Sequence, residues 1–301
     1  MKKAVGLMGL LGMYSPNPPT DVRAALTGLE KLSFDYVDTA EIYSRHAAPS
    51  KHLQRLFKGR ANCIQEKIGA NLDNDSGSLV QLIDETERLV SHYGELLFSI
   101  LVHRPTRNSV DRDVRYLEWL KSTHPHLSSG ICTNDLSVLS VIGQAVQFDY
   151  LQAAVNLLDF KRVEPLIIYC RERGIIVQAR SVLAGSLLSG MRSIEEVRSF
   201  SDPIRSRYSE TLASTAIFER RLSKVRLIKD YYDSQFSILG DYNGFSQFCY
   251  AATAALLING DIVAGGSVIS QIESNLAYQP VPEIFKTELA EKVDKWAAEY
   301  I

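Results

Sequence analysis

Four side chains that can exchange protons follow a regular pattern in the first third of the sequence. Asp38, Lys67 and His103 each lie at or near the end of a short apolar, β-rich segment, and Tyr43 follows Asp38 after Thr-Ala-Glu-Ile. Singly, each has an ordinary structural explanation: a helix-capping Asp, a solvated Lys, a core His and a surface Tyr. If the segments are neighbouring parallel strands, their ends meet at one edge and gather all four groups at one site.

These residue types favour proton transfer to an oxygen atom. A Lys beside an Asp forms a buried ion pair, and its charge lowers the pKa of a nearby Tyr from the usual value of about 10. Such a Tyr can donate a proton nearer neutral pH, while a His can donate a hydrogen bond to a carbonyl oxygen. The sequence contains no GxSxG, Cys–His nucleophile or HExxH motif, and no cluster that suggests a metal site. The pattern therefore favours hydride transfer to a carbonyl, with the hydride supplied by a cofactor.

The elements that would position these residues alternate between strands and helices. Apolar, β-rich segments predict eight strands, at 2–10, 34–38, 62–68, 96–103, 129–134, 149–156, 174–180 and 260–266. Helical spacing lies between them, which is typical of a parallel sheet. Eight such units in 301 residues predict an α/β fold, a (β/α)8 TIM barrel forming a single domain over 1–301. A doubly wound sheet is disfavoured because GLMGLLG (6–12) lacks the GxGxxG fingerprint.

The clearest helical patterns lie between these strands. They predict helices at 20–32, 78–94, 164–174 and 244–260. Ser78 and Gln81 form a capping-box pattern at the start of the second of these helices. The long, charged segment 191–243 is predicted to be an insertion of loop and helices near the active-site mouth.

Composition excludes several classes of function. Hydrophobic residues make up 46% of the chain and charged residues 23%, which indicates a globular protein. A net charge of −2 disfavours nucleic-acid binding. The sequence has no run of about 20 apolar residues, so no membrane span is predicted. The four cysteines have no metal-binding or CxxC spacing. We interpret the apolar N-terminal segment as a buried strand rather than a signal peptide, and we expect a cytoplasmic protein. The sequence indicates no oligomeric state.

Six segments, taken in order, resemble the aldo-keto reductase family. They are FDYVDTAEIY (34–43), EKIG (66–69), LVHRP (101–105), the pair Gln152 and Asn156, ARSVLAGSLLSG (179–190) and GGSVISQIESNL (265–276). The resemblance covers most of the chain and is weak in 107–128 and 191–243. It implies a (β/α)8 barrel and an NADP-dependent alcohol dehydrogenase or carbonyl reductase that reduces a small aldehyde or ketone. By this resemblance Tyr43 is the general acid, Lys67 and Asp38 tune it, and His103 orients the substrate carbonyl.

The resemblance also implies a set of cofactor-binding residues. Besides Asp38, the nicotinamide end would involve Thr133, Asn134, Gln152 and a stacked Arg180. Ser181, Leu183 and Gly185 would line the pyrophosphate, and the adenosine end would contact Gly265, Gly266, Ser267, Gln271 and Asn275. Ser270 and Glu273 form a capping-box pattern, which would direct the start of a helix toward the phosphates.

The chain departs from the family pattern in places that govern specificity. SRHAAPSKH (44–52) replaces the usual glycine-rich segment beside the substrate, and Leu10 replaces a Thr near the nicotinamide. Gly265 and Gln271 stand where relatives have Lys and Arg for the 2′-phosphate. We therefore expect NADPH to be preferred over NADH, but less strongly than in such relatives. A basic residue from 191–243, such as Arg205 or Arg207, would add the missing charge.

Two alternative functions remain open at this point. One is a non-catalytic, regulatory nucleotide-binding barrel, because a fold does not determine a function. The other is a barrel lyase or isomerase in which Lys67 forms a Schiff base. Binding of the nicotinamide cofactor would distinguish the reductase from the lyase or isomerase. Turnover of an aldehyde would distinguish the reductase from the regulatory barrel.

Overall fold

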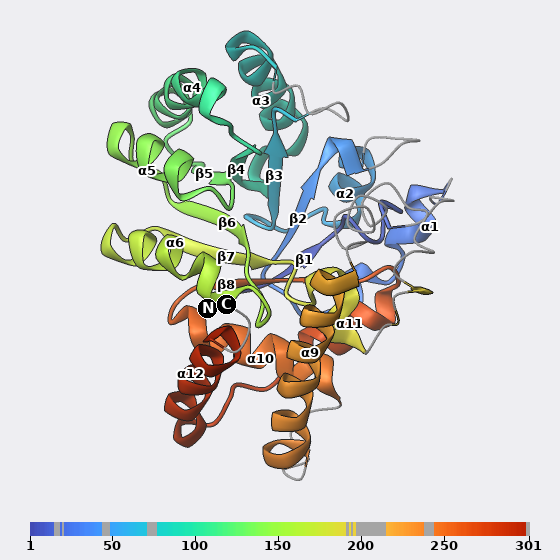
Figure 1. Ribbon diagram of the computed structural model, residues 1–301. Coiled ribbons are helices and arrows are strands. Elements are labelled where there is room, and N and C mark those ends of the chain that lie inside the picture. Colours follow the sequence, from blue (N-terminus) through green and yellow to red (C-terminus); the bar gives the residue numbers. More distant parts are fainter. Residues whose placement is uncertain are drawn as a thin grey trace.

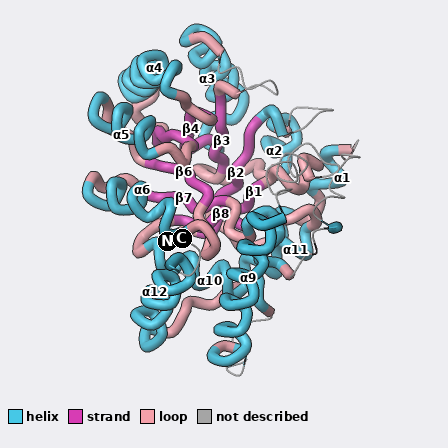
Figure 2. The backbone as a smooth tube through the Cα atoms, viewed as in Figure 1, coloured by secondary structure: helices cyan, strands magenta, loops and turns pink. Residues whose placement is uncertain are grey.

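The protein is a closed barrel of eight parallel strands surrounded by helices, as predicted (Figure 1). The computed structural model describes residues 1–14, 19, 21–43, 49–70, 77–190, 193, 195–196, 215–237 and 244–298. Every strand pairs with its neighbours in sequence, and β1 pairs with β8 to close the barrel. The strands occupy the centre and the helices the outside (Figure 2).

All eight strands coincide with predicted segments. Their bounds are β1 Lys3–Gly6, β2 Tyr36–Ala40, β3 Ile64–Ile68, β4 Leu97–His103, β5 Ser128–Cys132, β6 Tyr150–Ala154, β7 Ile176–Arg180 and β8 Asp261–Gly265. The first strand is shorter than predicted, because the chain turns after Gly6. Gly9 in that turn approaches the chain after β8 so closely that a Cβ atom would lie 2.3 Å from the carbonyl oxygen of Gly266.

The helices between the strands largely follow the predicted pattern. Their bounds are α1 Val22–Leu26, α2 Ser50–Leu56, α3 Leu79–Tyr93, α4 Val110–Thr123, α5 Leu136–Ala145, α6 Phe160–Glu172, α9 Thr215–Gln235, α10 Phe245–Leu257, α11 Ile269–Leu276 and α12 Glu283–Ala298. The capping box of Ser78 and Gln81 is present at the start of α3. The prediction of a continuous helix over 20–32 is wrong, because Thr27 is extended and ends α1, and Gly28 then adopts a left-handed φ of 94°.

Side chains that point into the barrel form layers of different chemistry. At its amino-terminal end, Tyr36, Phe98 and Tyr150 pack edge to face, with ring centroids 5.0 and 6.4 Å apart. Alternation along β2 then brings Asp38 inward two residues after Tyr36. The aromatic layer closes one end of the barrel and leaves the polar layer at the carboxyl ends of the strands. Chemistry in such barrels is located at that end.

The predicted insertion at 191–243 lies mostly outside the described residues, so its place near the active-site mouth stays a prediction. Its described part includes α9, which packs beside α10 and α12 (Figure 1). In the part of the chain that the structure describes, no helix is both long and apolar enough to cross a membrane. The same ranges contain no group of three or more His, Cys, Asp and Glu side chains placed to bind a metal ion.

Candidate active site

An ion pair lies at the carboxyl ends of β2 and β3. Lys67 Nζ donates to Asp38 Oδ2 at 2.5 Å, and both side chains are buried. Burial is the largest single influence on the pKa of Lys67 and lowers it, but the charge and hydrogen bond of Asp38, with Tyr43 and Cys132, together raise it by more, so the ammonium stays charged. The two strands pair in parallel, which brings these residues together although they are far apart in the sequence.

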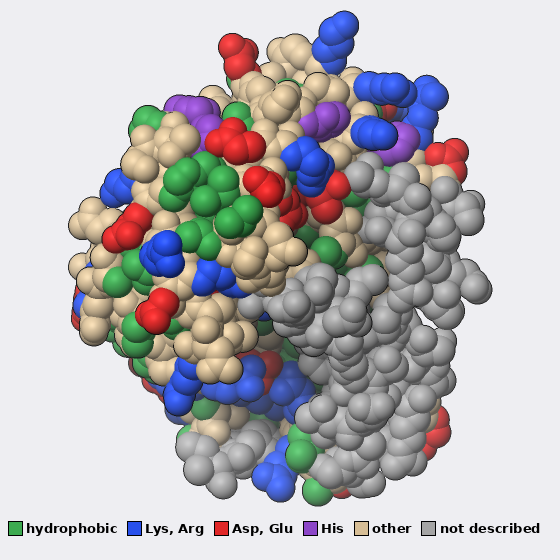
Figure 3. Space-filling model, turned by 90° about the horizontal axis from the view of Figure 1, so that it is seen from above, with side chains coloured by type: hydrophobic (Ala, Val, Ile, Leu, Met, Phe, Trp, Pro, Cys, Tyr) green, Lys and Arg blue, Asp and Glu red, His purple; other side chains and the backbone are tan. Residues whose placement is uncertain are grey.

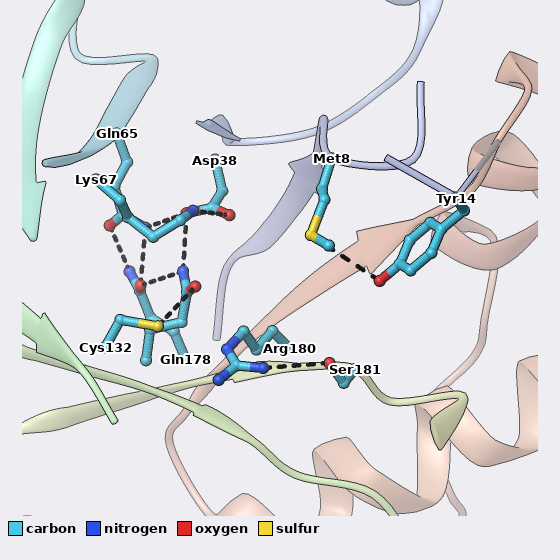
Figure 4. A network of polar contacts seen from close by, with 10 residues as sticks. Met8, Tyr14, Asp38, Gln65, Lys67, Cys132, Gln178, Arg180 and Ser181 are labelled. Atoms are coloured by element: carbon cyan, nitrogen blue, oxygen red, sulfur yellow. Dashed lines mark hydrogen bonds and ion pairs between the residues drawn. The ribbon is translucent and has the colours of Figure 1, made fainter. Parts of the chain in front are cut away.

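Two glutamine side chains hold the other oxygen of Asp38, and a third glutamine braces them in a buried network (Figure 4). The Nε2 groups of Gln65 and Gln152 donate to Asp38 Oδ1 at 2.9 and 2.8 Å. Gln178 exchanges two hydrogen bonds with Gln65, at 2.8 and 2.9 Å. The network fixes the position of the Asp38 carboxylate and provides hydrogen-bond donors to it, while the carboxylate keeps its charge. Gln65 and Gln178 were missed by the sequence analysis, although each is a polar residue within an apolar strand segment.

Tyr43 and His103 lie beside this ion pair. The Lys67 ammonium is 5.1 Å from the centroid of the Tyr43 ring, and the Tyr43 and His103 rings are 6.1 Å apart at 86°. The expected lowering of the Tyr43 pKa is wrong in its net direction. Burial raises that pKa to about 12, and the charge of Lys67 offsets only part of the increase. Tyr43 is therefore protonated across the neutral pH range, as a proton donor must be.

His103 is a buried, neutral imidazole. Burial lowers its pKa well below the usual 6.5, and the charges of Lys67, Arg104 and Arg180 lower it further. Its Nδ1 atom is buried and has no hydrogen-bond partner among the described residues. A neutral imidazole carries one N–H group, so His103 can donate one hydrogen bond to a substrate oxygen.

A cavity of about 770 Å³ extends from these residues to α11. Its walls include Asp38, Tyr43 and His103 together with most of the predicted cofactor residues, namely Gln152, Arg180, Ser181, Leu183, Gly185, Gly265, Gly266, Ser267, Gln271 and Asn275. Thr133 and Asn134 do not line it. The amide of Asn134 bonds both backbone groups of Ala154, and the Thr133 hydroxyl accepts from the Asp135 N–H. Asn134 thus holds the end of β6 and Thr133 the start of α5. Asn134 also accepts a hydrogen bond at 3.4 Å from Arg180, which lines the cavity.

The connection after β7 has an unusual backbone. Ser181, Ala184, Gly185 and Ser186 all have positive φ, between 49° and 80°. Such conformations are unfavourable for residues other than Gly, by roughly 1–3 kcal/mol each, and cluster at ligand sites. Successive turns of this kind direct backbone N–H groups into a concave surface that suits an anion. The predicted pyrophosphate residues thus lie on a segment suited to phosphate oxygens.

At the other end of the cavity, the predicted capping box of Ser270 and Glu273 is wrong. Helix α11 begins at Ile269, so both residues lie inside it, and no side chain caps its start. Gln271 instead accepts a hydrogen bond from the Ser267 N–H at 2.9 Å. The amide of Asn275 donates to the Gly265 carbonyl at 2.8 Å.

Several cavity residues were not found by sequence reasoning. They are Met8, Tyr14 and Arg104, the start of α10 at Phe245, Ser246 and Gln247, and Tyr250. The Tyr14 hydroxyl lies 4.0 Å from the Met8 sulfur (Figure 4). The Tyr250 hydroxyl accepts from the Gly265 N–H at 3.3 Å. Apart from Arg104, which lies in the LVHRP segment, these residues come from segments without a recognisable motif, so only the fold reveals them.

Behind the active site, Glu66 is a buried carboxyl between β3 and α3. Its Oε1 accepts from the Tyr93 hydroxyl at 2.7 Å, while Oε2 has no partner among the described residues. Burial raises the pKa of Glu66 to about 8, and Glu41 raises it further. When folding raises the pKa of an acid, the free energy of unfolding falls as the pH rises from the pKa in the unfolded chain to the pKa in the folded chain.

We therefore expect Glu66→Gln to stabilise the protein at pH 8 by an amount on the order of a few kcal/mol. The gain should shrink as pH falls toward about 4.5, because Glu66 is then protonated in the folded and unfolded chains alike. Denaturant unfolding of both proteins across this pH range measures it. The exposed Glu95→Gln serves as the control and should change little. A gain for Glu66→Gln that does not vary with pH would contradict the assignment.

The comparisons with known proteins identify the family of the chain. The sequence model of the aldo/keto reductase family matches residues 4–220, so the chain belongs to this family of oxidoreductases. Its members use nicotinamide cofactors and act on small carbonyl compounds. Among curated proteins, no relative matches the sequence significantly.

Solved structures share the fold at low sequence identity. A glycerol dehydrogenase from Gluconobacter oxydans has a TM-score of 0.72 at 16% identity, with 99% of this chain and 91% of that chain covered. The holo form of an aldo-keto reductase from Bacillus halodurans has a TM-score of 0.70 at 17% identity, with coverage of 98% and 91%. A variant of the protein Gox0644 in complex with NADPH has a TM-score of 0.62 at 14% identity, with coverage of 97% and 88%.

Proposed function

We propose that the protein reduces an aldehyde or ketone to an alcohol with NADPH or NADH, using Tyr43 as the general acid. The observation that carries this proposal is that Tyr43, Asp38 and His103 line one end of a long cavity, with Lys67 paired to Asp38 behind them. When bound, the nicotinamide supplies the hydride. The experiment is a screen of aldehydes and ketones that follows oxidation of the reduced cofactor.

Each residue of the site has a defined part in this reaction. The neutral His103 donates a hydrogen bond to the carbonyl oxygen and orients it. Tyr43 transfers its hydroxyl proton to the same oxygen as negative charge develops there. The Lys67 ammonium stabilises the resulting phenolate, and Asp38, held by its glutamine network, keeps that ammonium charged and in place.

The long cavity fits a dinucleotide. The positive-φ segment after β7 would hold the pyrophosphate, and Arg180 would pack against the nicotinamide. Gln152 lies on the cavity wall but also donates to Asp38, so it would link the cofactor site to the ion pair. We keep NADPH as the preferred cofactor.

The adenosine end of the cavity carries no charge among the described residues. Its walls are Gly265, Gly266, Ser267, Ser270, Gln271, Ser274 and Asn275. Neutral donors are weaker than charge-assisted ones by roughly a factor of two. We therefore expect the dissociation constant for NADH to exceed that for NADPH by less than about a thousandfold, or roughly 4 kcal/mol. A larger ratio would require a cation at the 2′-phosphate. The predicted sources of such a cation, Arg205 and Arg207, lie outside the described residues.

The substitution Gln271→Arg tests the same interpretation. A guanidinium at this position should raise the preference for NADPH by about 10- to 150-fold, because one charge-assisted hydrogen bond to phosphate contributes roughly 1.5–3 kcal/mol. The dissociation constants of both cofactors are measured at fixed salt concentration. Gln279→Arg, exposed and outside the cavity, is the matched control and should leave the ratio unchanged. An unchanged ratio in Gln271→Arg would place the 2′-phosphate elsewhere.

A regulatory nucleotide-binding barrel is the alternative function. It predicts cofactor binding without turnover of any carbonyl compound in the screen. The complete set of Asp38, Tyr43, Lys67 and His103 argues against it. We further propose that the protein acts in the cytoplasm, because its four cysteines are unpaired thiols.

A further inference from the structure

A second cavity, of about 480 Å³, lies where α6, α9 and α12 meet. It shares no lining residue with the cavity at the active site. Its walls come from the β6–α6 connection and first turn of α6, from one face of α9 and from the end of α12. On the face drawn in Figure 3, Lys and Arg side chains gather around an acidic side chain near the lower edge, and a second group of them lies near the upper right edge.

The charge of this cavity differs from that of the whole chain. Its lining includes five basic residues, Lys161, Arg162, Arg220, Arg221 and Lys224, and one acidic residue, Asp159. The chain as a whole carries a net charge of −2. Like charges held together in a concave surface repel one another, so such a grouping is unfavourable unless an anion offsets it.

Helix α9 presents this basic face by its periodicity. Ile217, Arg220, Arg221 and Lys224 are spaced so that they share one side of the helix. Neighbouring positions such as Phe218, Val225 and Ile228 are buried in the core. The helix thus packs through an apolar face and turns a separate basic face toward the β6–α6 connection.

Some of the basic groups are already held by the protein. Arg221 donates two parallel hydrogen bonds to the Asp159 carboxylate at 2.9 and 3.0 Å. Lys161 pairs with Glu164 and Asp294. These contacts fix two walls of the cavity and account for two of its five cations.

Three cations remain without a carboxylate partner among the described residues. Arg162 and Arg220 are exposed at the rim and form no ion pair. The Lys224 ammonium donates to the carbonyl oxygen of Leu158 at 2.5 Å and forms no ion pair with a described carboxylate. Burial lowers the pKa of Lys224 and Arg221 lowers it further, although Asp159 acts in the opposite direction. Two guanidinium forks and one ammonium around one space match the oxygens of a phosphate group.

The cavity is larger than a phosphate group, and part of its wall is apolar. Leu158, Ile217 and Ala297 line it, and the Ile217 side chain is 44% exposed. We propose that this cavity binds a small organic phosphate, with the phosphate on Arg162, Arg220 and Lys224 and the carbon part against Ile217 and Ala297. The site is separate from the proposed reductase site, and its occupancy does not depend on that function.

Isothermal titration of the full chain with phenyl phosphate and with inorganic phosphate, at fixed ionic strength, tests the proposal. Both should bind, and phenyl phosphate should bind at least threefold more tightly if the apolar wall contributes. Equal affinities would show that only the phosphate group is bound, and would overturn the proposal that the carbon part of the ligand contacts the apolar wall. Repeating the titrations with saturating NADPH should leave the binding in place, because the dinucleotide would fill the other cavity.

The double variant Arg162→Ala/Arg220→Ala should weaken phosphate binding at least tenfold. Both residues are exposed, so thermal unfolding without phosphate should match that of the unmodified protein. Arg226→Ala, which removes an exposed cation of α9 outside the cavity, is the matched control and should change the affinity less than twofold. The proposal is overturned if neither phosphate binds, or if the double variant and the control behave alike.

Discussion

Replacing Tyr43 with Phe is expected to lower kcat for carbonyl reduction by about 10²–10⁴-fold, the usual contribution of a positioned general acid. The substitution removes only the hydroxyl, and the ring that packs beside Lys67 and His103 remains. The affinity for the reduced cofactor should therefore change little. Steady-state kinetics on the best substrate of the screen, with cofactor binding followed by protein fluorescence, measures both quantities.

A second tyrosine in the same cavity provides the control for Tyr43→Phe. Tyr14→Phe removes a phenolic hydroxyl from the same cavity, where it contacts the Met8 sulfur rather than Lys67. This variant should retain most of its kcat. If Tyr43→Phe keeps more than about a third of the unmodified rate, the general acid is another group.

The second large effect is expected for Lys67→Met. Loss of the ammonium leaves the buried carboxylate of Asp38 without its cation, which should lower the stability by about 3–5 kcal/mol. It also removes the charge that stabilises the phenolate of Tyr43, so kcat should fall by about 10²–10³-fold. The Michaelis constant should change much less than kcat, because the ammonium acts mainly on the transition state.

The double variant Lys67→Met/Asp38→Asn separates these two consequences. It removes both charges, so the stability should recover toward that of the unmodified protein while kcat stays low. The pH dependence gives a further distinction. Without Lys67 the pKa of Tyr43 rises, and alcohol oxidation, which needs the ionised Tyr43, should begin at higher pH. A raised Michaelis constant with unchanged kcat and pH dependence would make Lys67 a substrate-binding residue.

The strands were the most predictable part of the fold. Most are short runs rich in apolar residues and bounded by polar ones, so hydrophobicity marks them; β3, with the sequence Ile-Gln-Glu-Lys-Ile, is the exception. Helix α1 was less predictable, because its apolar spacing continues past Gly28, where the chain adopts a left-handed conformation. Spacing describes which residues can share a face, whereas the end of a helix depends on the local backbone.

The clustering of the four proposed catalytic residues was predictable, because they stand at or near strand ends, where the barrel geometry decides their position. The pKa of Tyr43 was not, because burial opposes the effect of Lys67 and is the larger influence. Gln65 and Gln178 escaped prediction for a different reason. From the sequence, a Gln in a strand could equally face the solvent. Only the closed barrel shows that Gln65 donates to Asp38 and that Gln178 bonds Gln65. Gln271 was assigned to the cofactor by analogy, and its bond to the Ser267 N–H appears only in three dimensions.

Transfer of deuterium tests the central claim most directly. The reduced cofactor is deuterated at the hydride-donating carbon of its nicotinamide ring, and the alcohol product is examined by mass spectrometry and NMR. We predict one deuterium at the carbinol carbon in the product formed by the unmodified protein, and almost no product from Tyr43→Phe under the same conditions. A product without deuterium, or cofactor binding with no turnover across the whole screen, would contradict the account.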